Sequence, residues 1–85
     1  MRVLIPSALH SYTGGAWVEA AGGTVGAVLD DLDRQFPGIR FRMVDEQGAI
    51  RRHMRIFWQR EMVFDLSTPL DAAGELMIVQ ALSGG

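Results

Sequence analysis

The chain as given ends in two consecutive glycines, and its terminal carboxylate is the first group that could do chemistry. Gly84 and Gly85 have no Cβ, so they can lie extended in a channel too narrow for side chains. They could thereby carry the carboxylate to an active site on another protein. The same dipeptide can also be an ordinary unconstrained terminus, and on its own it does not decide between the two readings.

The side chains offer no stronger candidate for chemistry. The sequence contains no cysteine, which excludes a thiol nucleophile and a thiolate metal site. His10 and His53 lack a carboxylate at ligand spacing. The glycine-rich segment 22–26 has neither the spacing of a nucleotide fingerprint nor the lysine of a P-loop, so we expect it to end a hairpin and cap a helix. We therefore predict no catalytic residue and no metal site.

Length and charge limit the classes of partner. The 85 residues suffice for one domain with a small core, and the 48% hydrophobic content suggests more apolar residues than one core needs. A net charge of −2 gives no electrostatic footprint for nucleic acid. No apolar run approaches the ~20 residues that span a bilayer, and no signal peptide is apparent. We expect a soluble cytoplasmic protein that binds neither nucleic acid nor membrane.

Hydrophobic periodicity predicts a hairpin followed by a helix. An apolar strand is expected over residues 2–9, and its partner over residues 16–20 alternates with period two. Thr24 is a suitable N-cap, and Pro37-Gly38 is expected to end the helix. The helix has one apolar stripe formed by Val25, Val28, Leu29, Leu32 and Phe36.

The polar face of this helix carries three aspartates and an arginine. Asp30 and Arg34 are four residues apart and are expected to pair. The three aspartates Asp30, Asp31 and Asp33 are expected to form the water-facing side of the helix.

The second half of the chain predicts strands of a mixed sheet. Residues 39–50 contain a turn signal at 45–48 and are not otherwise assigned. Strands are expected over residues 54–59, 62–64 and 75–82, with a turn at Arg60-Glu61. This order predicts an α+β fold of the β-grasp (ubiquitin-like) type: a mixed sheet of four to five strands with one main helix on one face. The predicted domain spans residues 1–82, and residues 83–85 form a flexible tail.

Alternation along the strands predicts an uncovered apolar face. Side chains that share one parity are expected to point toward the helix: Val3, Ile5, Ile56, Trp58, Leu76 and Ile78. Leu4, Phe57, Met77 and Val79 then lie on the opposite face, where an apolar patch usually marks an interaction site. A bent strand or a homodimer could also hide them. Arg51, Arg52 and Arg55 are expected to form a solvated edge, with recognition of an acidic partner surface as a secondary reading.

The chain resembles the ubiquitin-like sulfur carriers of the ThiS/MoaD type. Segments spread over nearly the whole length carry the resemblance: Val3-Leu4-Ile5-Pro6, Tyr12 to Gly15, Thr24 to Leu29, Phe36-Pro37-Gly38, Gly48 to Phe57 and Ala81 to Gly85. The N-terminal part and residues 52–56 look most like the carriers that feed cysteine biosynthesis. Departures are Gln59-Arg60-Glu61 in place of an Asn-Gly-type turn, Gly74-Glu75 before the last strand, and Gln80 where proline is frequent.

The resemblance implies that Gly85 is the covalent site and that Leu82, Ser83 and Gly84 form the tail. A partner adenylyltransferase and sulfurtransferase of the ubiquitin-activating type would use ATP to adenylate Gly85 and convert it to a thiocarboxylate. A downstream synthase would then accept the sulfur for cysteine, thiamin thiazole, molybdopterin or a related product. The carrier itself would bind no cofactor and act as a protein cosubstrate. Two alternatives stay open: a ubiquitin-like modifier conjugated through Gly85, and the small subunit of molybdopterin synthase.

Overall fold

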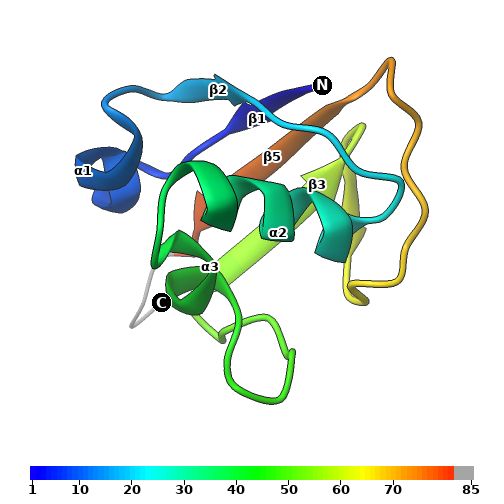
Figure 1. Cartoon of the computed structure of the whole chain (residues 1–85). Coiled ribbons are helices and arrows are strands. Elements are labelled where there is room, and N and C mark those ends of the chain that lie inside the picture. The colour runs from blue at the N-terminus through cyan, green and yellow to red at the C-terminus, as the bar shows by residue number, and fades with distance from the viewer. Residues whose placement is uncertain (82–85) are drawn as a thin grey trace.

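The computed structural model describes residues 1–81 and contains a five-stranded mixed sheet (Figure 1). The strand order is β2-β1-β5-β3-β4, with β1 and β5 parallel and the other neighbouring strands antiparallel. The strands are β1 (Arg2–Leu4), β2 (Trp17–Glu19), β3 (Met54–Trp58), β4 (Glu61–Val63) and β5 (Glu75–Gln80). The predicted β-grasp order is confirmed, with the last strand at the centre of the sheet.

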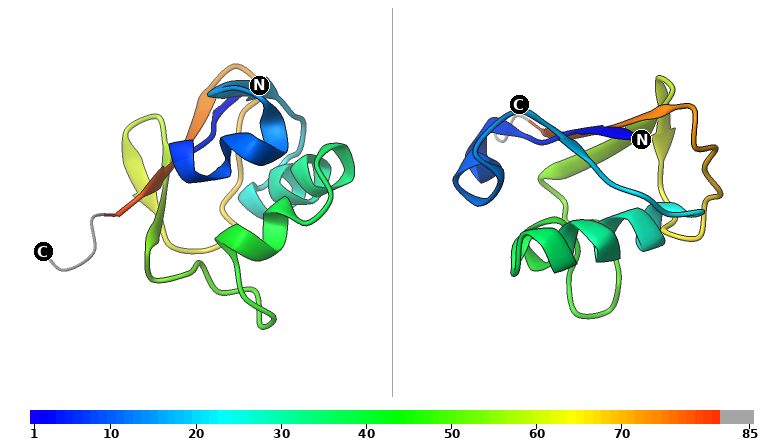
Figure 2. Two further views of the ribbon diagram at one scale, coloured as in Figure 1. Left: turned by 90° about the vertical axis from the view of Figure 1, so that its left-hand side faces the viewer. Right: turned by 45° about the horizontal axis from the view of Figure 1, so that its top comes forward.

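The helices form a second layer on one face of the sheet. The main helix α2 (Val25–Gln35) crosses the sheet and is followed by the short α3 (Ile39–Met43). Figure 2 (right) shows the strands in one layer and these two helices in the other. A 3₁₀ turn, η1 (Ser7–Leu9), and a single helical turn, α1 (His10–Thr13), lie beside the end of β1. No helix within residues 1–81 is both long and apolar enough to cross a bilayer.

The first strand is shorter than predicted. We expected a strand over 2–9 and a turn over 10–15, but the chain turns helical at Ser7. Pro6 has no N–H to continue the ladder, and its extended conformation (φ −64°, ψ 148°) leads into η1. The last sheet-like contact is the N–H of Ile5, which donates to the carbonyl of Ala16 at 2.7 Å.

The start of α2 explains the glycine-rich segment. The Thr24 hydroxyl accepts from the N–H of Ala27 at 3.1 Å, which confirms the predicted cap. The N–H groups of Val25 and Gly26 donate to the carbonyls of Thr68 and Leu66, so the connection before β5 satisfies donors that a phosphate would otherwise need. Segment 22–26 therefore joins the start of α2 to the connection before β5, and we call it the packing junction.

The pairing predicted for α2 was wrong, and one aspartate on its water-facing side has a further role. Arg34 pairs with Asp31 at 2.6 Å instead of with Asp30, while Asp30 lies 3.0 Å from Nε of Arg40. Asp33 does more than face water, because its carboxylate accepts the N–H groups of Gly38 and Arg40 at 3.1 Å each. Asp33 thus satisfies donors at the start of α3, an element that had not been assigned from the sequence.

The core lies between the helix layer and one face of the sheet. The fully buried strand residues are on the face that was predicted to point toward the helix. They pack with the apolar side chains of α2 and with Ile39, Met43 and Val44 from the α3 region. Trp58 and Phe36 are only partly buried but pack against this cluster. In the described part of the chain sixteen apolar residues are buried and no polar or charged residue is, so the core depends on close packing.

The β3–β4 turn has residue types that are uncommon for its backbone geometry. The residues at its tip are Gln59 (φ +49°) and Arg60 (φ +76°), one position earlier than predicted. Positive φ at both positions is the geometry for which hairpins prefer Asn-Gly. Gln59 and Arg60 therefore keep the backbone shape of an Asn-Gly turn, at the conformational cost of positive φ in residues with a side chain.

Two adjacent glycines provide a test of the packing junction. A Cβ on Gly22 would lie 2.6 Å from the backbone nitrogen of Val28, whereas one on Gly23 would meet no atom within 4 Å. We expect Gly22→Ala to destabilise the fold by about 1–3 kcal/mol in urea unfolding. Gly23→Ala, the matched control, should be neutral or stabilising by up to about 1 kcal/mol. Equal effects would contradict the close approach at Gly22.

A second pair of variants tests the register of α2. Leu32 is fully buried, and Leu32→Ala should reduce the free energy of unfolding by about 2–5 kcal/mol. Arg34 is 73% exposed in its side chain, so Arg34→Ala should cost no more than about 0.5 kcal/mol. Urea denaturation of both variants measures the difference. Similar losses would show that the helix faces the sheet with another side.

Candidate interaction face and tail exit

The strand that leads to the tail is held on both sides. β5 pairs with β1 through Arg2–Leu4 and with β3 through Met54–Trp58. The N–H of Ala81 also donates to the carbonyl of His53 at 2.7 Å, so the ladder continues to the last described residue. Leu82, Ser83, Gly84 and Gly85, including the predicted covalent site, lie outside the described residues. The sheet therefore fixes the point from which the tail begins.

The helix-free face carries one apolar residue from every strand at the same level. Leu4 pairs in register with Trp17 on one side and with Met77 on the other, and Phe57 pairs with Met77 and with Met62. We call this set the apolar row; in sheet order it consists of Trp17, Leu4, Met77, Phe57 and Met62. It crosses the whole sheet on the side away from α2.

The apolar row includes three of the four residues predicted to bind partners. Leu4, Met77 and Phe57 are half-buried because their neighbours in the row partly cover them, and Val79 lies two residues beyond Met77, opposite Arg55. Their binding role stays a prediction. The sequence analysis missed the ends of the row, Trp17 and Met62, which are 39% and 41% exposed. Strand pairing to Leu4 and to Phe57 would have identified both.

Charged residues border one side of the apolar row. The Arg2 guanidinium lies 3.0 Å from the Glu75 carboxylate and 4.1 Å from the centre of the Trp17 ring. Glu19 pairs with Arg2 in the β1–β2 register. These contacts hold the Trp17 ring at the sheet edge. The row thus has an apolar centre and a polar border, as interaction surfaces commonly do.

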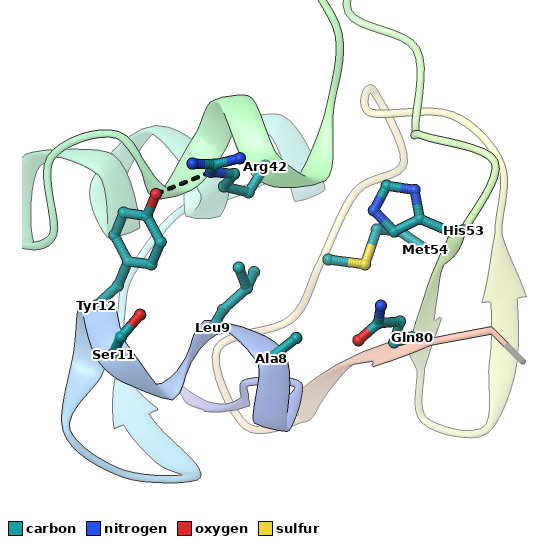
Figure 3. A pocket seen from close by; sticks show the side chains of 8 residues that line it. All are labelled: Ala8, Leu9, Ser11, Tyr12, Arg42, His53, Met54 and Gln80. Atoms are coloured by element: carbon teal, nitrogen blue, oxygen red, sulfur yellow. Dashed lines mark hydrogen bonds between the residues drawn. The ribbon is translucent and has the colours of Figure 1, made fainter.

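A polar hollow of about 420 Å³ lies where β5 ends (Figure 3). Figure 3 shows Tyr12 and Arg42 facing His53, Met54 and Gln80 across it. Nε of Arg42 donates to the Tyr12 hydroxyl at 2.9 Å, and this hydrogen bond raises the pKa of Arg42 above its ordinary value. None of the described residues that line it is acidic. The hollow therefore has a positive character beside the tail exit.

The predicted arginine cluster is partly folded back on the protein. Nε of Arg51 donates to the Phe41 carbonyl at 2.7 Å, and its guanidinium lies 4.6 Å from the centre of the Phe41 ring. Arg55 donates to the carbonyls of Arg52 and Met54 at 2.7 and 2.8 Å. These side chains are held in place, more firmly than a merely solvated edge would require.

The two histidines lie in different settings. Nε2 of His10 lies 2.9 Å from the Ile5 carbonyl, which ties α1 to the end of β1. His53 is exposed and lines the polar hollow. Among residues 1–81 no group of three His, Cys, Asp or Glu side chains is arranged to hold a metal ion.

Comparison with known proteins identifies relatives over the full length. No family model matches the chain. It is 35% identical to the sulfur carrier protein CysO of Mycobacterium tuberculosis and to that of Mycobacterium bovis, over an alignment of 91 positions that covers 100% of this chain and 98% of each relative. The recognition made from sequence motifs is thereby confirmed, and these relatives agree with the cysteine-biosynthesis branch.

Solved structures give the same result. A CysO in the crystal structure of the Amycolatopsis orientalis BexX/CysO complex matches with a TM-score of 0.90 and 32% identity, covering 99% of this chain and 98% of that one. Mycobacterium tuberculosis CysO matches with the same score and identity over 95% of this chain and 98% of that one. SAMP1 from Haloferax volcanii, 26% identical, matches with a TM-score of 0.77 over 100% of this chain and 98% of that one. The chain belongs to the ubiquitin-like sulfur carrier proteins.

Proposed function

We propose that the chain carries sulfur as a thiocarboxylate on Gly85. Similarity to sulfur carriers along the whole chain, together with the Gly84-Gly85 ending, is the observation on which this proposal rests. A carboxylate is a poor acyl donor because oxide is a poor leaving group. In the proposed reaction, the Gly85 carboxylate attacks the α-phosphate of ATP and releases pyrophosphate. Sulfide then displaces AMP from the acyl-adenylate to give the thiocarboxylate directly. If a persulfide displaces AMP instead, the product is an acyl disulfide, and a thiol then cleaves its S–S bond to release the thiocarboxylate and form a disulfide.

In this proposal the partner performs the chemistry and the carrier presents the substrate. An adenylyltransferase and sulfurtransferase of the ubiquitin-activating type binds ATP and supplies the general acids and bases. This chain supplies the carboxylate, an unbranched Gly-Gly approach to it, and a strand that holds the tail's starting point. The chain is thus a protein cosubstrate, and a cysteine-forming synthase is the proposed sulfur acceptor.

Intact-mass measurement tests the covalent site directly. Incubation with the adenylating enzyme, ATP and a sulfide donor should add about 16 Da, the difference between one sulfur and one oxygen atom, and the change should map to Gly85. Deleting Gly85 should abolish the change and leave the melting temperature nearly unaltered. A mass increase on an internal residue, or one that survives this deletion, would overturn the proposal.

Attachment to other proteins is a second candidate function. The similarity to SAMP1 of Haloferax volcanii, which is described as a small archaeal modifier protein, favours considering it. Both functions begin with activation of the same carboxylate. They differ in the nucleophile that attacks the activated carboxylate: sulfur in a carrier, and an amine of the target protein in a modifier. Immunoblotting of cells that express the chain distinguishes them: conjugates of higher mass that disappear when Gly85 is deleted would indicate modification.

The apolar row is the surface proposed to contact these partners. It offers two aromatic side chains, Phe57 inside the row and Trp17 at the sheet edge, and interfaces draw much of their energy from a few such anchors. Docking on this face would also contact β5, which leads directly to the tail. The BexX/CysO complex indicates that a related carrier associates with another protein.

Two phenylalanines provide a matched test of this surface. Phe57→Ala should weaken binding to the adenylating enzyme by about 2 kcal/mol, roughly thirtyfold in Kd, with a smaller loss of folding stability. Phe36→Ala, at a position that packs against the core, should reduce stability and leave affinity almost unchanged. Calorimetric titration and urea unfolding measure the two quantities. The reverse pattern would mean that Phe57 serves the core.

A further inference from the structure

The positive charges of this protein are unevenly compensated. Arg2, Arg34 and Arg40 each have a carboxylate oxygen within 3.0 Å. The other five arginines have none within 4.0 Å among residues 1–81. Four of these five, together with His53, fall in the short stretch from α3 to the start of β3. We call this group the basic band; its members are Arg42, Arg51, Arg52, His53 and Arg55.

Three members of the basic band are positioned by neutral acceptors. Arg42 is held by the Tyr12 hydroxyl, Arg51 by the Phe41 carbonyl and ring, and Arg55 by two backbone carbonyls. A neutral acceptor orders a guanidinium without cancelling its charge. The cost of ordering these long side chains is therefore already met in the free protein, which favours binding an anion from outside.

The band is continuous over the surface. The polar hollow at the tail exit is lined by Arg42 and His53, and a smaller hollow beside it is lined by both of these and by Arg51. A third hollow, of about 510 Å³, is lined by Arg51, Arg52 and Arg55 together with apolar side chains. Within residues 1–81, none of the side chains that line these three hollows is acidic.

The carboxylate of Asp45, the acidic group that interacts most directly with the basic band, already accepts hydrogen bonds within its own turn. The Asp45 carboxylate accepts the N–H groups of Gln47 and Ala49 at 2.9 Å each, and the Ala49 bond is the main reason that the pKa of Asp45 is low. Arg51 lowers that pKa further only through its field and forms no ion pair with Asp45. The turn at 45–48 thus leaves the guanidinium groups available.

We infer that the basic band binds an acidic segment of the partner protein that acts on the tail, at a surface that adjoins the apolar row, since Met62 of the row lines the same hollow as Arg55. The identity of that partner rests on the proposed function. The position is suitable because His53 accepts the last described backbone hydrogen bond before the tail and Gln80 lines the polar hollow. Attraction at this point would align the tail with the partner's entrance and accelerate association.

The band can be tested without any partner enzyme. The full chain, labelled with ¹⁵N, is titrated with an acetylated, amidated tetraglutamate peptide at about 50 mM salt, where charges separated by some 10 Å still interact. We expect the shifted backbone signals to cluster at residues 8–12, 42, 51–55 and 80. Shifts spread evenly over all eight arginines would overturn the inference, and so would tighter binding of a short oligonucleotide or of ATP than of the peptide.

Charge reversal provides the matched comparison. Arg42→Glu should weaken peptide binding at least about fivefold, and Arg52→Glu should do the same without removing a side-chain hydrogen bond or ion pair found among residues 1–81. Arg60→Glu makes the same charge change at an exposed turn outside the band and should have less than a twofold effect. Equal losses in band and control variants would show that only net charge matters.

The adenylating enzyme then separates this inference from the proposed function. Arg42→Glu and Arg52→Glu should slow association about tenfold at low salt, and the difference from Arg60→Glu should largely vanish near 0.5 M salt. If the enzyme adenylates all variants after equally fast association, the basic band is not a docking surface although the carrier function stands. If it adenylates none, including the unaltered chain, the carrier function fails and the peptide titration still decides the inference.

Discussion

The pairing of β5 between β1 and β3 is the constraint on which the other features depend. It fixes the register of three strands at once, so the same alternation directs Leu76 and Ile78 into the core and Met77 onto the opposite face. Because the pairing continues to Ala81, the core and the tail's starting point are held by the same ladder. A change that shifted β5 by one residue would exchange the two faces and also displace the chain's exit.

The parts of the fold that follow a strict period could be predicted from the sequence. The stripe of α2, its Thr24 cap and the face to which each strand residue belongs are local properties of the chain, and the structure contains them. The β-grasp order followed from these elements and from the resemblance.

The errors fall where a distant contact overrides the local pattern. Leu9 is buried whether residues 7–9 form a strand or a 3₁₀ turn, so its hydrophobicity could not separate the two. Arg34 pairs with Asp31 instead of Asp30 because Asp30 is already paired with Arg40, which belongs to α3. Likewise, the apolar row spans five strands, and its outer members could be found only through strand pairing. The predicted covalent site does not depend on the fold in this way, since its prediction came from the Gly84-Gly85 ending and from family resemblance.

The way Arg55 folds back has a consequence for self-association. At the start of β3 the N–H of Met54 donates to the Arg51 carbonyl, and the Met54 carbonyl accepts from the Arg55 guanidinium. These are the backbone groups that β4, which ends its pairing at Ile56, leaves without a strand partner. Another chain could add a strand here only by breaking both hydrogen bonds and displacing a charge. The start of β3 is thereby protected from pairing with the sheet of another copy of this chain.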